Sequence, residues 1–176
     1  VTNNQEEIRY FELVLRPKQP FQRDINIYDV IITAEQYGYM MLLGTKIVEF
    51  AFKEIASMSL KPGKFRFNIN ISAVQFEDPG FTDFVKMLMS QYSVLPELLT
   101  FELTESAFMH KTEILLAHVE QLRALGFYIA LDDFGEGYSS LSRLDQMNLD
   151  ILKLDMAFIP RMSRSQQSQM VVNGLI

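Results

Sequence analysis

The stretch FYIALDD, residues 127–133, places an apolar run directly before two adjacent carboxylates, Asp132 and Asp133. A short apolar run next to glycine-containing segments is typical of a buried β-strand. Neighbouring carboxylates repel each other and lose hydration when buried, so the stability of the fold alone does not explain this pair. We therefore expect the strand to end at a site where a cation lies beside the two acids.

Four more short runs of this kind lie on either side of residues 127–133, and longer segments with helical periodicity separate them. The runs are RYFELVLR (9–16), FRFNINIS (65–72), LTFELTE (99–105) and DILKLD (150–155). The intervening segments predict two helices within 27–58, broken near Gly38, one within 80–95 and one over 111–126 that ends at Gly126. Strands alternating with helices predict a parallel sheet in one α/β domain, residues 1–176.

Side chains alternate between the two faces of a strand, so each run can be divided into an apolar face and a polar face. The polar faces carry Glu12, Arg66, Asn68, Asn70, Glu102, Asp132 and Lys153. A sheet covered by helices on both faces would have nearly continuous apolar strands. One polar face instead favours a barrel whose inner face leads to a site at the carboxyl ends of its strands.

The polar residues at the ends of these runs are of the types that bind a hard divalent cation. Any single one is more often a structural polar group, but the whole set together indicates a site. Carboxylate and amide oxygens suit Mg²⁺ or Mn²⁺, Asp133 could bridge two ions, and Lys153 could position or activate a water. His110 and His118 are interpreted as packed or solvent-facing side chains rather than as metal ligands.

Composition excludes several other classes of protein. The net charge of −6 and the sequence pI near 4.9 argue against binding a nucleic acid polymer. Cysteine is absent, which excludes disulfides and thiolate metal sites. No apolar run approaches the roughly 20 residues of a membrane span. These features predict a segment without membrane contact, cytoplasmic in location, although a parent protein could carry an inner-membrane anchor elsewhere.

Five motifs, in order along the chain, resemble those of the EAL domain family of bacterial cyclic di-GMP phosphodiesterases. They are ELVLR, NINISAVQF, FELTES, DDFGEGYSSL and LKLD. The resemblance implies a TIM-like (β/α)8 barrel with an antiparallel first strand, of which this chain covers about strands 2 to 6. It also implies hydrolysis of cyclic di-GMP to linear pGpG with two Mg²⁺ or Mn²⁺ ions, in signalling that controls biofilm formation and motility.

The same resemblance implies roles for individual residues. The implied metal ligands are Glu12, Asn70, Glu102, Asp132 and Asp133. Lys153 would contact the nucleophilic water, Arg16 would hold a substrate phosphate, and Glu105 would anchor the loop after Asp133. A homodimer is the implied assembly, and a parent protein could add sensory or GGDEF domains.

Three features of the sequence, at four positions, depart from the family pattern. Leu13 and Val14 replace the usual Ala-Leu after the first glutamate, Pro17 replaces a tryptophan, and Glu136 stands where threonine is usual. The retained ligand set favours activity. One alternative is a degenerate domain that binds cyclic di-GMP or a protein partner without cleaving it. Another is a barrel of enolase type, which abstracts a proton from a carboxylate substrate.

The length of the chain leads to a further expectation. A complete barrel of this kind takes roughly 250 residues, whereas this chain has 176 and contains no Ala-Glu-Gly-Val-Glu segment, which in the family carries another metal-binding glutamate. We expect the chain to lack the family's first strand and its C-terminal strands. An open sheet would expose its edges, so we expect the segment alone to be poorly soluble and inactive.

Overall fold

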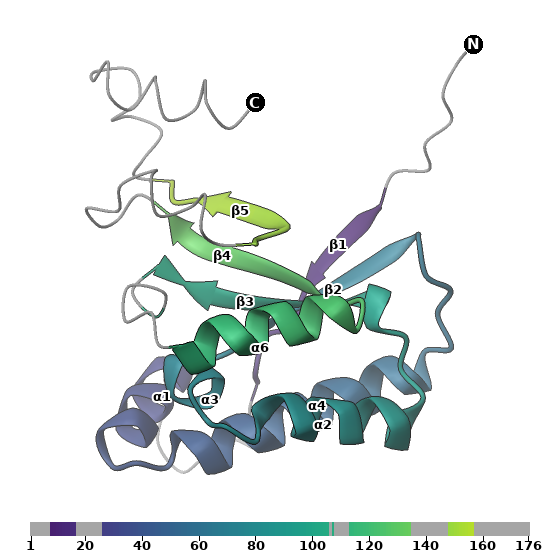
Figure 1. Cartoon of the computed structure of the whole chain (residues 1–176). Helices are drawn as coiled ribbons and strands as arrows, with labels where there is room; N and C mark the ends of the chain where they lie inside the picture. Colours follow the sequence, from purple (N-terminus) through teal and green to yellow (C-terminus); the bar gives the residue numbers. More distant parts are fainter. Residues whose placement is uncertain (1–7, 17–25, 106, 108–112, 135–147, 157–176) are drawn as a thin grey trace, which may run out of the picture.

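Five parallel strands form one sheet, and helices cover one of its faces (Figure 1). The computed structural model describes residues 8–16, 26–105, 107, 113–134 and 148–156. The strands are β1 (Arg9–Glu12), β2 (Phe65–Asn70), β3 (Leu99–Thr104), β4 (Tyr128–Phe134) and β5 (Ile151–Leu154), and their order in the sheet is their order along the chain. The five predicted strands and their parallel pairing are confirmed.

Four strands are shorter than the sequence predicted, β3 and β5 by one and two residues, and β1 and β2 for reasons that lie in their neighbours. β1 ends at Glu12 rather than at residue 16, because the amide of Leu13 donates the last ladder hydrogen bond, to Asn68 O at 2.9 Å. β2 ends at Asn70 because Ser72 caps a short helix, α3 (Ala73–Phe76), which the sequence analysis missed. The signal was present in the sequence, since Ser72 and Gln75 form a capping box.

The helices lie close to the predicted segments. They are α1 (Ile27–Gln36), α2 (Met40–Ser57), α4 (Phe81–Tyr92) and α6 (Glu113–Ala124), with a short 3₁₀ turn η1 at Pro96–Leu98. The break between α1 and α2 falls at Gly38, whose φ of +73° lies in the left-handed region that favours glycine. No helix in the described ranges is both long enough and apolar enough to cross a membrane.

The hydrophobic core lies between the helices and the apolar face of the sheet. Its sheet side comes from alternate residues of the strands, including Phe67, Ile69, Phe101, Leu103, Ile129 and Leu131. Leu115, Val119 and Leu122 of α6 are buried there, and Leu125, directly after the helix, is partly buried against them. Each buried side chain of this size contributes about 1.5–3 kcal/mol.

His118 is packed within the helical layer, which agrees with its interpretation as a structural residue. Its Nε2 lies 2.9 Å from the carbonyl oxygen of Asp78, and its Nδ1 contacts the hydroxyl of Thr82. A carbonyl oxygen only accepts, so Nε2 donates and Nδ1 accepts from Thr82. The ring thereby ties α6 to α4 and to the loop before it, whereas His110 lies outside the described residues.

The opposite face of the sheet is polar. Near the amino ends of the strands, a cation–π contact joins side chains of β2 and β4 on this face. The guanidinium of Arg66 on β2 lies 3.4 Å from the ring centroid of Tyr128 on β4, and donates to the hydroxyl of Tyr10 at 3.2 Å. Alternate strands contribute to one layer in this way inside a TIM-type barrel. The polar face therefore has a packed floor, above which the carboxyl ends of the strands carry the site.

Gly44, in the second turn of α2, is required by the close approach of the Gln75 side chain. A Cβ placed on Gly44 would overlap the amide group of Gln75, which is 2% exposed and belongs to the capping box of α3. We predict that Gly44→Ala lowers the free energy of unfolding by about 1–3 kcal/mol. At an unobstructed helix position the same change would stabilise by roughly 1 kcal/mol.

Urea unfolding of Gly44→Ala, Gln75→Ala and the double variant measures this effect. The double variant should recover stability relative to the sum of the single changes, because removing the Gln75 side chain frees the space that a methyl group at position 44 would need. If the two changes in the free energy of unfolding are purely additive, the contact with Gln75 is not the reason for a glycine at position 44.

Candidate functional site

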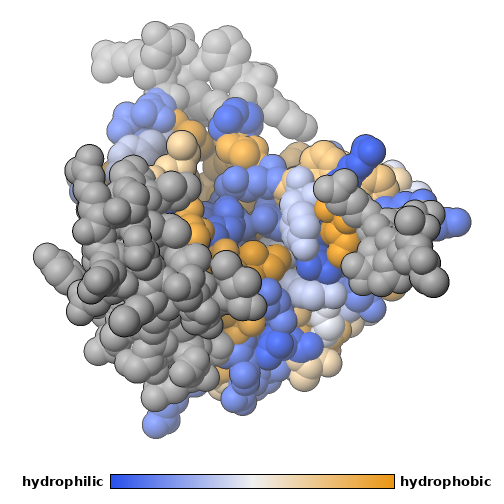
Figure 2. All heavy atoms as spheres, turned by 90° about the horizontal axis from the view of Figure 1, so that it is seen from above, coloured by the Kyte–Doolittle hydropathy of each residue, from blue (hydrophilic) through white to orange (hydrophobic). Residues whose placement is uncertain are grey.

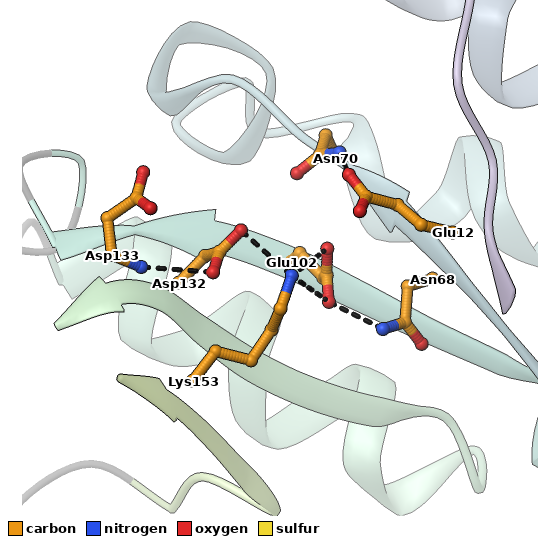
Figure 3. A network of polar contacts seen from close by, with 7 residues as sticks. All are labelled: Glu12, Asn68, Asn70, Glu102, Asp132, Asp133 and Lys153. Atoms are coloured by element: carbon orange, nitrogen blue, oxygen red, sulfur yellow. Dashed lines mark hydrogen bonds and ion pairs between the residues drawn. The ribbon is translucent and has the colours of Figure 1, made fainter. Parts of the chain in front are cut away.

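The polar side chains predicted to form a site meet on the open face of the sheet (Figure 3). In the parallel register Asn70 lies opposite Glu102, and Asp132 lies opposite Thr104, two residues further toward the carboxyl ends of the strands. The amide of Asn70 donates to Glu12 Oε1 at 2.9 Å, which joins β1 to the group. Figure 2 shows hydrophilic atoms gathered at the centre of this face, with apolar atoms beside them.

Lys153 of β5 lies between two of the carboxylates. Its Nζ is 3.0 Å from Asp132 Oδ2 and 3.1 Å from Glu102 Oε2. Burial opposes the charge of Lys153, but its hydrogen bonds to Asp132 and Glu102 and their negative charges raise the pKa of the ammonium above its usual value. Lys153 is therefore a protonated hydrogen-bond donor at neutral pH, and not a base.

Glu102 is the most deeply buried acid of the group, at 1% exposed. Burial raises the pKa of its carboxyl group, the ion pair with Lys153 lowers it, and the charges of Asp132 and Glu12 raise it again, with a net increase. The single ammonium of Lys153 thus compensates only part of the negative charge on this face.

Asp133 reaches the same face as Asp132 because β4 contains a bulge. The pairing of β4 with β5 shifts between Leu131 and Phe134, and Asp133 has a φ of +57°, in the left-handed region. Leu131 and Phe134 both enter the core, so the two residues between them both project to the polar side. Strict alternation would have turned Asp133 toward the helices.

The bulge brings Asp133 into a cluster of like charges. Burial raises the pKa of its carboxyl group first, and the charges of Asp132 and Asp155 raise it further; Lys153 lowers it and Glu12 raises it. A left-handed backbone at a non-glycine residue costs on the order of 1 kcal/mol or more. Strain and repulsion at one residue indicate a functional role rather than a stabilising one.

The five predicted metal ligands remain a prediction, but their chemistry fits a divalent cation. In the part of the chain that the structure describes, no three carboxylates or imidazoles converge on one point, and Lys153 stands between Glu102 and Asp132. Oxygen donors from β1 to β4 nevertheless share one face. Two of the carboxyl groups have raised pKa values, and a hard cation would relieve that excess of negative charge.

Other predicted site residues lie around this group. Arg16 is exposed beyond the end of β1, donates to Leu15 O at 3.1 Å, and lines a cavity of about 450 Å³ against α2. Glu105 is buried directly after β3. The loop that it would anchor, with Glu136, and also Pro17 lie outside the described residues.

One residue that had no role in the sequence analysis proves to be part of the group. The side-chain amide of Asn68 donates to Glu102 Oε1 at 2.6 Å, within the buried floor of the site. Its position two residues before Asn70, on the same face of β2, was the available signal.

We predict that Asp133→Asn stabilises the metal-free protein at neutral pH by roughly 0.5–1 kcal/mol, the range typical of one exposed charge pair. The folded pKa of Asp133 is raised above 3.8, so its contribution to stability is present below pH 3.8 and is lost as the pH rises through the raised value. The advantage of the variant should therefore vanish in acid.

Urea unfolding in metal-free buffer from pH 3 to pH 7 checks this. Asp83→Asn, the same change at an exposed acid on α4, serves as the control. Equal stability of the wild type and Asp133→Asn at pH 7 would show that Asp133 is not repelled by the neighbouring carboxylates.

Comparison with known proteins places this chain in a family. The family model of the EAL domain matches residues 1–176. Cyclic di-GMP phosphodiesterase PdeR of Escherichia coli (strain K12) is 31% identical over 170 residues, which cover 97% of this chain and 26% of PdeR. Bifunctional diguanylate cyclase/cyclic di-GMP phosphodiesterase MucR of Pseudomonas aeruginosa is 32% identical over 167 residues, 94% of this chain and 24% of MucR.

A solved structure, the PaMucR phosphodiesterase in complex with c-di-GMP, superposes with a TM-score of 0.77 at 30% identity. The match covers 93% of this chain and 66% of that one. The five-stranded sheet is thus the corresponding part of a TIM-like barrel, as predicted, and the chain spans about a quarter of the length of the two curated relatives. The chain belongs to the EAL domain family.

Proposed function

We propose that this chain provides the catalytic face of a metal-dependent phosphodiesterase that hydrolyses cyclic di-GMP to linear pGpG. The observation that carries the proposal is the meeting of four carboxylates, Asn70 and Lys153 on one face of a parallel sheet. PdeR and MucR, with which the chain shares about a third of its residues, are named as cyclic di-GMP phosphodiesterases.

Mg²⁺ or Mn²⁺ is the cofactor that this donor set would take. The residues proposed to hold two such ions are Glu12, Asn70, Glu102, Asp132 and Asp133. When bound, the ions would lower the pKa of a coordinated water and neutralise charge on the phosphodiester. In the reaction the water oxygen joins phosphorus, one P–O ester bond breaks, and the departing oxygen gains a proton.

Lys153 contributes a fixed positive charge beside the reacting groups. Its ammonium can donate a hydrogen bond to the attacking water or to a phosphate oxygen. Asp132 and Glu102 hold the ammonium in place from two neighbouring strands.

The partners proposed for this chain follow from the same assignment. Cyclic di-GMP is the ligand, with Arg16 as a phosphate-binding residue and Glu105 as the anchor of the loop after Asp133. The chain would act as a cytoplasmic homodimer, fused in a larger protein to sensory or GGDEF domains. The double activity in the name of MucR supports such a fusion.

Asp132→Asn should lower turnover by roughly 10² or more, because it removes a charge that the metal site needs while preserving the shape of the side chain. Wild type and variant, in the natural full-length protein, are incubated with cyclic di-GMP and Mn²⁺, and pGpG is measured by chromatography. Asp83→Asn, an exposed acid on α4, is the matched control and should keep full activity. Wild-type protein that binds cyclic di-GMP but yields no pGpG would favour a receptor instead.

Lys153→Met keeps the aliphatic stem and removes the ammonium. It should lower kcat by about 10²-fold with little change in KM, since the charge acts on the reacting centre rather than on bound substrate. Steady-state kinetics separate the two parameters. An equal loss in KM would assign Lys153 to holding a substrate phosphate.

A further inference from the structure

Glu102 is held at both of its carboxylate oxygens by residues of two other strands. Asn68 Nδ2 on β2 donates to Oε1 at 2.6 Å, and Lys153 Nζ on β5 lies 3.1 Å from both Oε1 and Oε2 (Figure 3). A carboxylate with a donor at each oxygen cannot rotate without losing a hydrogen bond. The direction in which Glu102 presents its oxygens is therefore set by Asn68 and Lys153 together.

Asn68 donates to a buried carboxylate but leaves its own carbonyl oxygen unsatisfied. Its side chain is 8% exposed, and its Oδ1 has no hydrogen-bond partner among the described residues. An unsatisfied buried polar atom costs about 1–3 kcal/mol, and an apolar residue would avoid that cost. The amide orientation is nevertheless determined, because turning Oδ1 toward Glu102 would place two acceptors against each other.

An amide at position 68 also differs from a cation in its effect on the charge of Glu102. Lysine or arginine would neutralise Glu102, whereas the neutral Asn68 orients the carboxylate and leaves its negative charge available to a metal ion. Groups that hydrogen-bond to metal ligands in this way typically change metal affinity 10–100-fold when they are mutated.

We infer that Asn68 is a positioning residue, which holds the Glu102 carboxylate in the direction required for binding a divalent cation. This inference rests on the proposed metal site. It assigns to Asn68 a role separate from that of Asn70, which is proposed as a ligand itself and donates to Glu12 instead.

Asn68→Leu removes the donor and the unsatisfied carbonyl together while keeping a similar shape. In the natural full-length protein, Mn²⁺ affinity measured calorimetrically without substrate should fall about 10-fold or more. At saturating Mn²⁺, kcat should fall and KM for cyclic di-GMP should change less than about twofold, as expected for a residue that acts through a metal ligand. Added Mn²⁺ should raise the melting temperature of Asn68→Leu less than that of the wild type, a difference that a purely structural role would not produce.

Two further variants serve as controls for this test. Thr100→Val is the matched control, because Thr100 pairs with Asn68 in the register, is fully buried, and has a hydroxyl without a partner among the described residues. Its Mn²⁺ affinity should equal that of the wild type. Asn68→Ala removes the same donor without added bulk, so an overpacked core in Asn68→Leu cannot imitate the effect.

Glu102→Gln separates this inference from the proposed function. If Glu102→Gln weakens Mn²⁺ binding and both Asn68 variants bind as the wild type does, the positioning role is wrong and the metal site stands. If Glu102→Gln binds Mn²⁺ normally, Glu102 is not a ligand and both assignments fail.

Discussion

The parallel hydrogen-bond register of β2, β3 and β4 is the constraint on which the site depends. It sets Asn70 beside Glu102 and Thr104 beside Asp132, and so turns residues more than 25 positions apart in sequence into neighbours. A slip of one residue would turn each of these side chains into the helical core. The apolar residues that alternate with them, packed under α2, α4 and α6, prevent such a slip, so the core and the site specify the same register.

The carboxyl end of β4 shows how the fold accommodates charge that does not stabilise it. The left-handed backbone of Asp133 delivers a second carboxylate to a face where Asp132 already projects, and the burial of Leu131 and Phe134 on either side holds the bulge in place. Strain and repulsion there are offset by packing on the opposite face. Lys153 compensates part of the charge, and the remainder is what we propose a divalent cation would compensate.

The inner face is organised in two levels with different tasks. Near the amino ends of the strands, Arg66 is stacked on Tyr128 and fills space on this face. Nearer the carboxyl ends, Asn68 and Lys153 orient Glu102. Arg66 and Asn68 are two residues apart on β2, yet the first serves packing and the second positions a carboxylate. Their polarity alone does not distinguish these two roles.

The sequence by itself determined the five strands, their parallel order and the face on which each polar residue lies, because hydrophobic periodicity and burial follow the same period of two. It also indicated the acids at the strand ends through their motifs. Only the tertiary structure decided the short end of β1, the turn of Asp133 to the polar face, and the contacts of Lys153 and Asn68 with Glu102. Those features depend on a bulge and on side chains from strands far apart in the chain, and alternation within a single strand carries no information about either.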